Sequence, residues 1–425
     1  MAGFLFKRSA RNVRLCAPAF EMQPGKPRIL AYCASNIGMG HYGRLSRVLA
    51  RVREKIPECS LLLATDLRPG AGPLPDGIEL LRLPGFRFED DDAFRERPEI
   101  LRLSSKQLAL LRSNVLLAAG VSFQPHLLLL DTNPHGKRDE LLPLLRHLRA
   151  KAGRQRVFLM LRDIPCAPGE KFKLSGPPSQ MAKHAAYYDR ILVSGARNFY
   201  DIGESFGWSQ ELEEKTLYAG FVVPSNTLLS REEAFSFFPA LDAGKRTVVC
   251  SFGGGWEVEN LAPLIVTGFL AASKAAQPMT QLALFAGPAV EEAVLENLRV
   301  KIGDAGGVAL FKFTPHFPAL LAHCDLALLQ AGSTAFQLLD TTIPMLLYSR
   351  DYKIEEQKLR AERLCCFPGI RQMTDQRLSA AAWQEGIRWG LTCPRVQRQT
   401  GFAFDGLETI AREIADTALN LCGGL

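Results

Sequence analysis

A histidine lies among glycines between an apolar run and an amphipathic stretch near the start of the chain. Segment 35–44, SNIGMGHYGR, follows RILAYCA and precedes LSRVLARVREKI. Histidine titrates near neutral pH and can take the proton of an attacking hydroxyl. His41 alone of the seven histidines lies in a glycine-rich segment at the end of the first apolar run, so it is the candidate general base. The alternative is that His41 only caps the turn.

Two acidic residues are candidate partners of this histidine. Asp131 ends the apolar run LLLLD and should therefore lie at the same edge of a parallel sheet, where it can orient His41 in a His-Asp pair. Asp163, in LRDIP, is the competing partner, and both acids have the alternative role of capping residues. We assign Asp163 and its neighbour Arg162 to contacts with an acceptor substrate.

Glycine-rich turns indicate an anionic ligand. Gly253 and Gly254, in SFGGGWE, follow an apolar run and precede an amphipathic stretch, and glycine lets backbone N–H groups approach a phosphate closely. The alternative is a turn that needs positive φ. Gly38, Gly40 and Gly43 have the same setting in the first half and are interpreted as clearing space for an acceptor and for a donor phosphate.

Segment 313–364 combines hydroxyl, amide and carboxylate side chains at expected strand ends. Backbone amides and hydroxyls suit a phosphate, whereas carboxylates and amides suit sugar hydroxyls. This mixture is typical of a nucleotide-sugar site. The residues concerned are Gly332, Ser333, Thr334, Gln337, Asp351, Glu355, Glu356 and Gln357.

These residues need parallel strands to bring them together. Short apolar runs alternate with amphipathic stretches, which is the pattern of strands joined by crossover helices. We expect six strands in the first half and, after a restart at RTVVCSF, five in the second. The predicted fold class is α/β, with two tandem Rossmann-like doubly wound domains and an interdomain cleft that holds the ligand.

The 425 residues accommodate two such domains. The predicted parts are an N-terminal extension (1–26), an acceptor-binding domain (27–222), a linker (223–232), a nucleotide-sugar-binding domain (233–402) and a C-terminal helix (403–425). We expect that helix to pack back on the N-terminal domain.

Composition excludes several classes of protein. Hydrophobic residues make up 47% and charged residues 22%, and the absence of a long uncharged apolar run predicts no transmembrane helix. Ten cysteines without CxxC spacing argue against zinc and disulfides, and the basic residues behind the net charge of +7 are too dispersed for a nucleic-acid site. A cytoplasmic location is the default. The first twenty residues suit either a frayed terminus or a peripheral contact with an anionic membrane.

Segment 313–364 resembles the donor-binding region of GT-B glycosyltransferases, especially the family that includes MurG. The N-terminal half is similar to a group of predicted bacterial glycosyltransferases related to MurG. The resemblance rests on GMGHYGR, LRDIP, YYDRILVSG, YAGFVVP and EEQKLRAERL, and extends over nearly the whole chain from Arg28.

The resemblance implies roles for individual residues. Phe313 to Phe317 would hold the nucleotide base, Gly332 to Thr334 would meet the diphosphate, and Glu356 with Gln357 would hold the donor sugar. His41 takes the family's place for a base or acceptor-contacting residue. Gln337 stands where relatives usually have a glutamate that binds the ribose, so the chain departs from the pattern there.

The predicted function is an inverting, metal-independent glycosyltransferase that moves a hexose or N-acetylhexosamine from a UDP-sugar to an acceptor. The acidic run Asp90–Asp92 is interpreted as a solvated loop, and we predict no cofactor and no metal. The partners are a nucleotide sugar and an acceptor that is a small molecule, natural product or lipid-linked sugar. Two alternatives remain: a nucleotide-sugar 2-epimerase and an inactive partner protein of the same fold.

Overall fold

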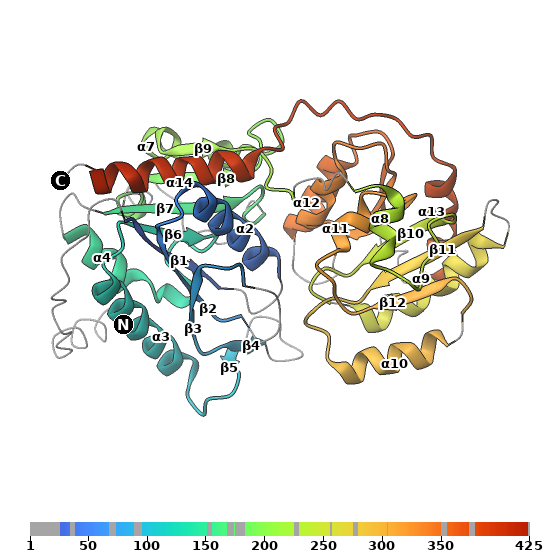
Figure 1. Ribbon diagram of the computed structural model, residues 1–425, viewed down its shortest axis with the longest axis horizontal. Helices are drawn as coiled ribbons and strands as arrows, with labels where there is room; N and C mark the ends of the chain where they lie inside the picture. The colour runs from blue at the N-terminus through green and yellow to red at the C-terminus, as the bar shows by residue number, and fades with distance from the viewer. Residues whose placement is uncertain are drawn as a thin grey trace.

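The computed structural model consists of two α/β domains (Figure 1). It describes residues 26–34, 39–67, 74–88, 96–150, 155–167, 174, 183–224, 229–255, 257–274, 279–303, 305–349, 355–373 and 379–423. No helix within these ranges is long and apolar enough to cross a membrane.

The N-terminal domain is built on a seven-stranded parallel sheet. Its strand order is β3-β2-β1-β6-β7-β8-β9, and its central strands are almost wholly apolar because helices cover both faces. The strands are β1 (Arg28–Cys33), β2 (Ser60–Thr65), β3 (Ile78–Arg82), β6 (Leu127–Asp131), β7 (Arg156–Arg162), β8 (Arg190–Ser194) and β9 (Thr216–Tyr218). A separate antiparallel pair joins β4 (Phe86–Phe88) and β5 (Glu96–Pro98).

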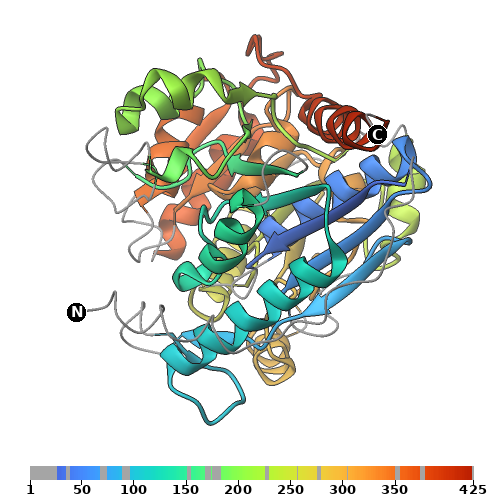
Figure 2. The ribbon, with the colours of Figure 1, turned by 90° about the vertical axis from the view of Figure 1, so that its left-hand side faces the viewer.

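The helices of this domain lie between the strands. They are α2 (Met39–Lys55), α3 (Ser105–Phe123), η1 (Lys137–Asp139), α4 (Leu142–Ala150), α6 (Ile202–Phe206) and α7 (Gln210–Glu214). Helix α3 begins at a capping box, in which the Ser104 hydroxyl accepts from the backbone N–H of Gln107 and the Gln107 side chain accepts from Ser104. Figure 2 looks onto this domain from its end.

Two features of the N-terminal domain differ from the sequence expectation. Strand β3 was not expected, because most of its side chains are not buried and the apolar signal is weak. Helix α2 begins at Met39, although the apolar periodicity starts at Leu45. The histidine thus lies in the first helical turn rather than in a glycine loop, because Gly40 and Gly43 are accommodated within the helix.

The C-terminal domain is built on a six-stranded parallel sheet. Its order is β12-β11-β10-β13-β14-β15, one strand more than the five expected, because β15 is a short edge strand with two polar residues. The strands are β10 (Arg246–Ser251), β11 (Thr280–Phe285), β12 (Val308–Phe311), β13 (Leu326–Gln330), β14 (Met345–Tyr348) and β15 (Ile370–Met373). The helices are α8 (Arg231–Ser236), α9 (Val258–Ser273), α10 (Glu292–Ile302), α11 (Phe317–Leu321), η2 (Ser333–Leu338), α12 (Glu355–Leu364) and α13 (Ala380–Thr392).

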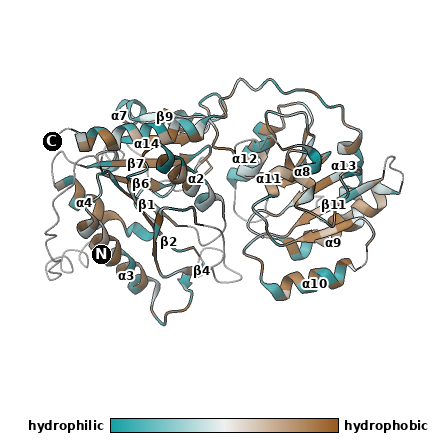
Figure 3. Ribbon diagram, viewed as in Figure 1, coloured by the Kyte–Doolittle hydropathy of each residue, from teal (hydrophilic) through white to brown (hydrophobic). Residues whose placement is uncertain are grey.

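The chain returns to the N-terminal domain at its end. Helix α14 (Gly406–Gly423) packs against α2, and its Glu408 accepts from Arg51 at 2.7 Å. The returning segment is fixed just before the helix, where Phe221 donates its backbone N–H to Ala403 at 2.8 Å. Figure 3 shows apolar strands inside both domains and more polar outer helix faces. The C-terminal helix thus packs on the N-terminal domain.

Candidate active site

The candidate site lies where the strand order of each sheet reverses. The reversal falls between β1 and β6 in one domain and between β10 and β13 in the other. Ligands of such sheets bind outside the carboxyl ends of the strands at this point. Helix α2 follows β1 and carries His41, and Asp131 ends β6. The sequence-predicted catalytic pair therefore occupies the reversal point of the N-terminal sheet.

His41 and Asp131 are in direct contact. The Nδ1 atom of His41 lies 2.8 Å from Oδ2 of Asp131. The carboxylate side chain is 1% exposed, whereas the imidazole is 31% exposed. An ionised carboxylate only accepts hydrogen bonds, so Nδ1 donates and Nε2 keeps its lone pair. This arrangement leaves one ring nitrogen available to a ligand as a base.

Arg44 and Thr132 complete the surroundings of this pair. Arg44 donates to Oδ1 of Asp131 at 2.6 Å and to Oγ1 of Thr132 at 2.9 Å. The Thr132 hydroxyl lies 3.1 Å from Nδ1 of His41. Thr132 has a φ of 63°, a backbone conformation that is strained for a β-branched residue. Neither residue was predicted from the sequence. The available signals were the spacing of three between His41 and Arg44 and the position of Thr132 directly after the strand.

The electrostatics of the pair favour a neutral histidine beside an ionised acid. Burial lowers the pKa of His41 below its ordinary 6.5, against the opposing effect of Asp131. Burial alone would raise the pKa of Asp131, but the charges of Arg44 and His41 and their hydrogen bonds lower it overall. Near neutral pH, His41 is therefore unprotonated at Nε2 and Asp131 is ionised.

The glycine turn of the C-terminal domain follows β10. Gly253 has a φ of 57° and Gly255 a φ of 106°, so both adopt the left-handed conformation that favours glycine. A Cβ atom on Gly253 would lie 3.2 Å from Oε1 of Gln330, at the end of β13. Gly254 lies between them in the same turn. The structure thus supports the positive-φ explanation, and the turn still lies at the reversal point of the sheet.

The second predicted donor segment follows β13. Gly332 precedes the 3₁₀-helix η2, which includes Ser333, Thr334 and Gln337. A Cβ atom on Gly40, in the first turn of α2, would lie 3.9 Å from the Ser333 hydroxyl, and both residues are exposed to solvent. The two reversal points therefore face each other across the domain interface. Phe313, after β12, is 44% exposed.

The residues assigned to the acceptor and to the donor sugar bind one another. Arg162, at the end of β7, donates to Oε1 of Glu356 at 3.0 Å, and Asp163 accepts from Nε of Arg360 at 2.6 Å. Arg360 also donates to the Ala331 carbonyl at 2.8 Å. Helix α12 is thus bonded both to β7 and to the turn after β13. We call His41, Arg44, Asp131, Thr132, Arg162 and Glu356 the interdomain cluster.

Some predicted residues fall outside this cluster. Gln357, next to Glu356, is buried. Gly38, Asp351 and Asp90–Asp92 lie outside the described residues. Within the described ranges, no group of three or more histidine, cysteine or acidic side chains is placed to hold a metal ion. A cavity of about 580 Å³ is lined by none of the predicted site residues; its lining residues are Arg197, Asn198, Asp201, Glu204, Ser205 and Arg363.

Comparison with known proteins identifies the fold. No family model and no curated protein sequence matches the chain. Among solved structures, MurG of Acinetobacter baumannii superposes with a TM-score of 0.53 at 11% identity, covering 94% of this chain and 100% of MurG. The calicheamicin glycosyltransferase CalG4 gives 0.52 at 14% identity, covering 94% and 95%. The UDP-GlcNAc 2-epimerase of Methanocaldococcus jannaschii gives 0.56 at 11% identity, covering 92% and 99%. The chain therefore has the GT-B fold, as the sequence resemblance predicted.

Proposed function

We propose that the chain is an inverting, metal-independent glycosyltransferase that moves a hexose or N-acetylhexosamine from a UDP-sugar to an acceptor hydroxyl. The observation that carries this proposal is the His41–Asp131 contact at the reversal point of one sheet, opposite Ser333 at the reversal point of the other. A base and a donor-binding turn on facing strand ends suit a transfer reaction between two substrates. Solved GT-B structures of glycosyltransferases give the proposal a precedent in fold.

The reaction needs one proton acceptor and stabilisation of one leaving group. Nε2 of His41 takes the hydroxyl proton while the acceptor oxygen bonds to the anomeric carbon. The bond from that carbon to the diphosphate oxygen breaks on the opposite face, and the electron pair leaves with the diphosphate. Asp131 stabilises the imidazolium that forms, and backbone N–H groups after β10 and β13 stabilise the leaving group.

The ionic contacts favour a transferase over a 2-epimerase. An epimerase of this fold would use acidic residues near the anomeric carbon. Asp131, Asp163 and Glu356 are each bonded to an arginine, at 2.6, 2.6 and 3.0 Å respectively. His41 therefore supplies the available base in the interdomain cluster.

The test is the variant His41→Ala, assayed with UDP-glucose, UDP-galactose and UDP-GlcNAc by mass spectrometry. We expect transfer to fall by about 10²- to 10⁴-fold while UDP binding persists. His323→Ala is the control, because His323 lies in the second domain and its Nε2 contacts the Leu229 carbonyl at 2.8 Å. Equal turnover by His41→Ala would rule out the base. Release of a free epimerised sugar would indicate the epimerase, and failure of the wild-type chain to bind any nucleotide would exclude both enzymes.

A further inference from the structure

One cation of the interdomain cluster has unused hydrogen-bonding capacity. A guanidinium carries five N–H donors. Arg162 makes one hydrogen bond to the described residues, through NH2 to Glu356, and its side chain is 21% exposed. Arg360, by contrast, is fully buried and bonds Asp163, Ala331 and Ile164. Arg162 therefore keeps N–H groups from which an anionic ligand can accept hydrogen bonds.

The aspartates near Arg162 are already bonded to other residues. Asp131 binds His41 and Arg44, and Asp163 receives two N–H groups of Arg360, at 2.6 and 3.3 Å. Glu356 is thus the carboxylate that remains for Arg162 among the described residues. Burial, followed by the charge of Arg360, lowers the pKa of Arg162. A phosphate oxygen in this position would accept from the N–H groups of Arg162 that Glu356 leaves unbonded.

Arg162 is linked through neighbouring residues to both the proposed base and the proposed donor turn. Asp131 and Arg162 end the adjacent strands β6 and β7, and the charge of Arg162 acts on His41. Its partner Glu356 is on α12, the helix that Arg360 bonds to the carbonyl of Ala331, directly before Gly332. A leaving diphosphate would occupy this same region.

We propose that Arg162 binds the diphosphate of the nucleotide-sugar donor, and that the carboxylate of Glu356 holds that anion position while no donor is bound. This inference rests on the proposed function and replaces the assignment of Arg162 to the acceptor. When the bond from the anomeric carbon to the diphosphate oxygen breaks, negative charge develops on the diphosphate. A guanidinium beside it stabilises that charge and forms two parallel hydrogen bonds with phosphate oxygens.

The inference predicts opposite effects for the two partners. Arg162→Gln should weaken UDP binding by about 10- to 100-fold, because it removes charged hydrogen bonds, and should leave uridine binding unchanged. Glu356→Gln should strengthen UDP binding by about 2- to 10-fold, because it removes the competing carboxylate. Arg162→Lys, which keeps a point charge, should give an intermediate affinity. Isothermal titration of the full chain with UDP and with uridine measures each value.

A matched control lies on the same strand. Arg156, at the amino end of β7, is a partly exposed arginine 3.9 Å from Asp189, and Arg156→Gln should leave UDP binding unchanged. Thermal unfolding checks that each variant is folded. Unchanged UDP affinity in Arg162→Gln would overturn the inference, and so would equal weakening by Glu356→Gln, which would mark a purely structural ion pair.

The two proposals fail in different ways. A chain that binds UDP through Arg162 but transfers no sugar would overturn the proposed function alone. A chain that transfers sugar while Arg162→Gln binds UDP normally would overturn this inference alone. If the wild-type chain binds no UDP, both fall.

Discussion

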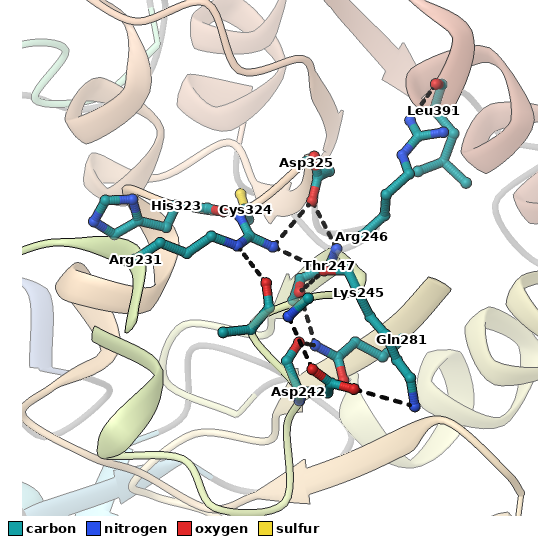
Figure 4. Close-up of polar contacts among 12 residues, drawn as sticks. Arg231, Asp242, Lys245, Arg246, Thr247, Gln281, His323, Cys324, Asp325 and Leu391 are labelled. Carbon is teal, nitrogen blue, oxygen red and sulfur yellow. Dashed lines mark hydrogen bonds and ion pairs between the residues drawn. The ribbon is translucent and has the colours of Figure 1, made fainter. Parts of the chain in front are cut away.

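Charged side chains gather at both ends of the parallel strands, and the two ends use them differently. At the amino ends of the C-terminal sheet, Asp325 accepts from the backbone N–H of Thr247 at 2.8 Å and from Arg395 at 2.9 Å. Arg231 donates to the carbonyls of Ala243 and Lys245, each at 2.8 Å. Figure 4 shows Arg231, Thr247 and Asp325 together at this end of the sheet. Most of these contacts join a side chain to backbone.

The interdomain cluster at the carboxyl ends joins side chains to one another instead. Asp131 accepts from Arg44 and His41, and Arg162 donates to Glu356 across the two domains. His41 and Arg162 remain partly exposed, at 31% and 21%. Bonds to backbone fix the ends of strands, whereas partly exposed side chains with unused donors and lone pairs can meet a ligand. The difference predicts stability effects at one end and catalytic effects at the other.

The largest expected difference is in kcat, between the variants Asp131→Asn and Asp325→Asn. An amide at position 131 must turn its NH₂ group toward Arg44 or His41, and donation to His41 would place the ring proton on Nε2 and remove the base. We expect kcat of the folded protein to fall by about 10²-fold or more, and we also expect a loss of stability, because Asp131 is buried and paired with Arg44. Asp325→Asn should cost about 1.5–3 kcal/mol of stability and leave kcat of the folded protein unchanged.

Steady-state kinetics and thermal unfolding of both variants check this contrast. A kcat loss in Asp325→Asn that is as large as in Asp131→Asn would erase the distinction between the two ends.

A smaller effect is expected in the pH dependence of kcat/KM, which reports the pKa of His41 in the interdomain cluster. Burial lowers the pKa of His41, so the histidine stays neutral as the pH falls through 6.5, and the acidic limb should lie below that value. Arg44→Gln removes a positive charge that lowers this pKa, so the limb should move to higher pH. Profiles of kcat/KM between about pH 5 and pH 8 measure the acidic limb of the wild-type protein and of Arg44→Gln. A limb that stays in place in Arg44→Gln would mean that another group controls it.

Much of the fold could be predicted from the sequence because its strands are buried on both faces. The runs that became β1, β6, β10 and β13 are almost continuously apolar, and their order implied two parallel sheets. Strands β3 and β15 were missed because these two edge strands are only partly buried and include polar residues. Helix α2 starts six residues before its first expected residue. The first turn was not predicted because glycine has a low helix propensity.

The candidate site was only partly predictable for a related reason. Asp131 was recognisable because it ends an apolar run, and its contact with His41 follows from the positions of strands β1 and β6 in one sheet. The ion pair of Arg162 with Glu356 joins residues 194 positions apart in different domains. No local pattern encodes that pairing, because it depends on how the two domains meet.

The smallest expected effect is a difference in UDP affinity between alanine variants of two glycines that share a backbone conformation. Gly253 has a φ of 57° and Gly401 a φ of 66°, so alanine at either position should cost about 1 kcal/mol of stability. A Cβ atom on Gly253 would meet Oε1 of Gln330 at 3.2 Å, whereas one on Gly401 would meet nothing within 4 Å. We therefore expect Gly253→Ala to weaken UDP binding several-fold and Gly401→Ala to leave it unchanged, as measured by titration calorimetry. Equal UDP affinities in the two variants would show that the turn after β10 serves the fold alone, and would confine the donor contacts to the turn after β13 and to Arg162.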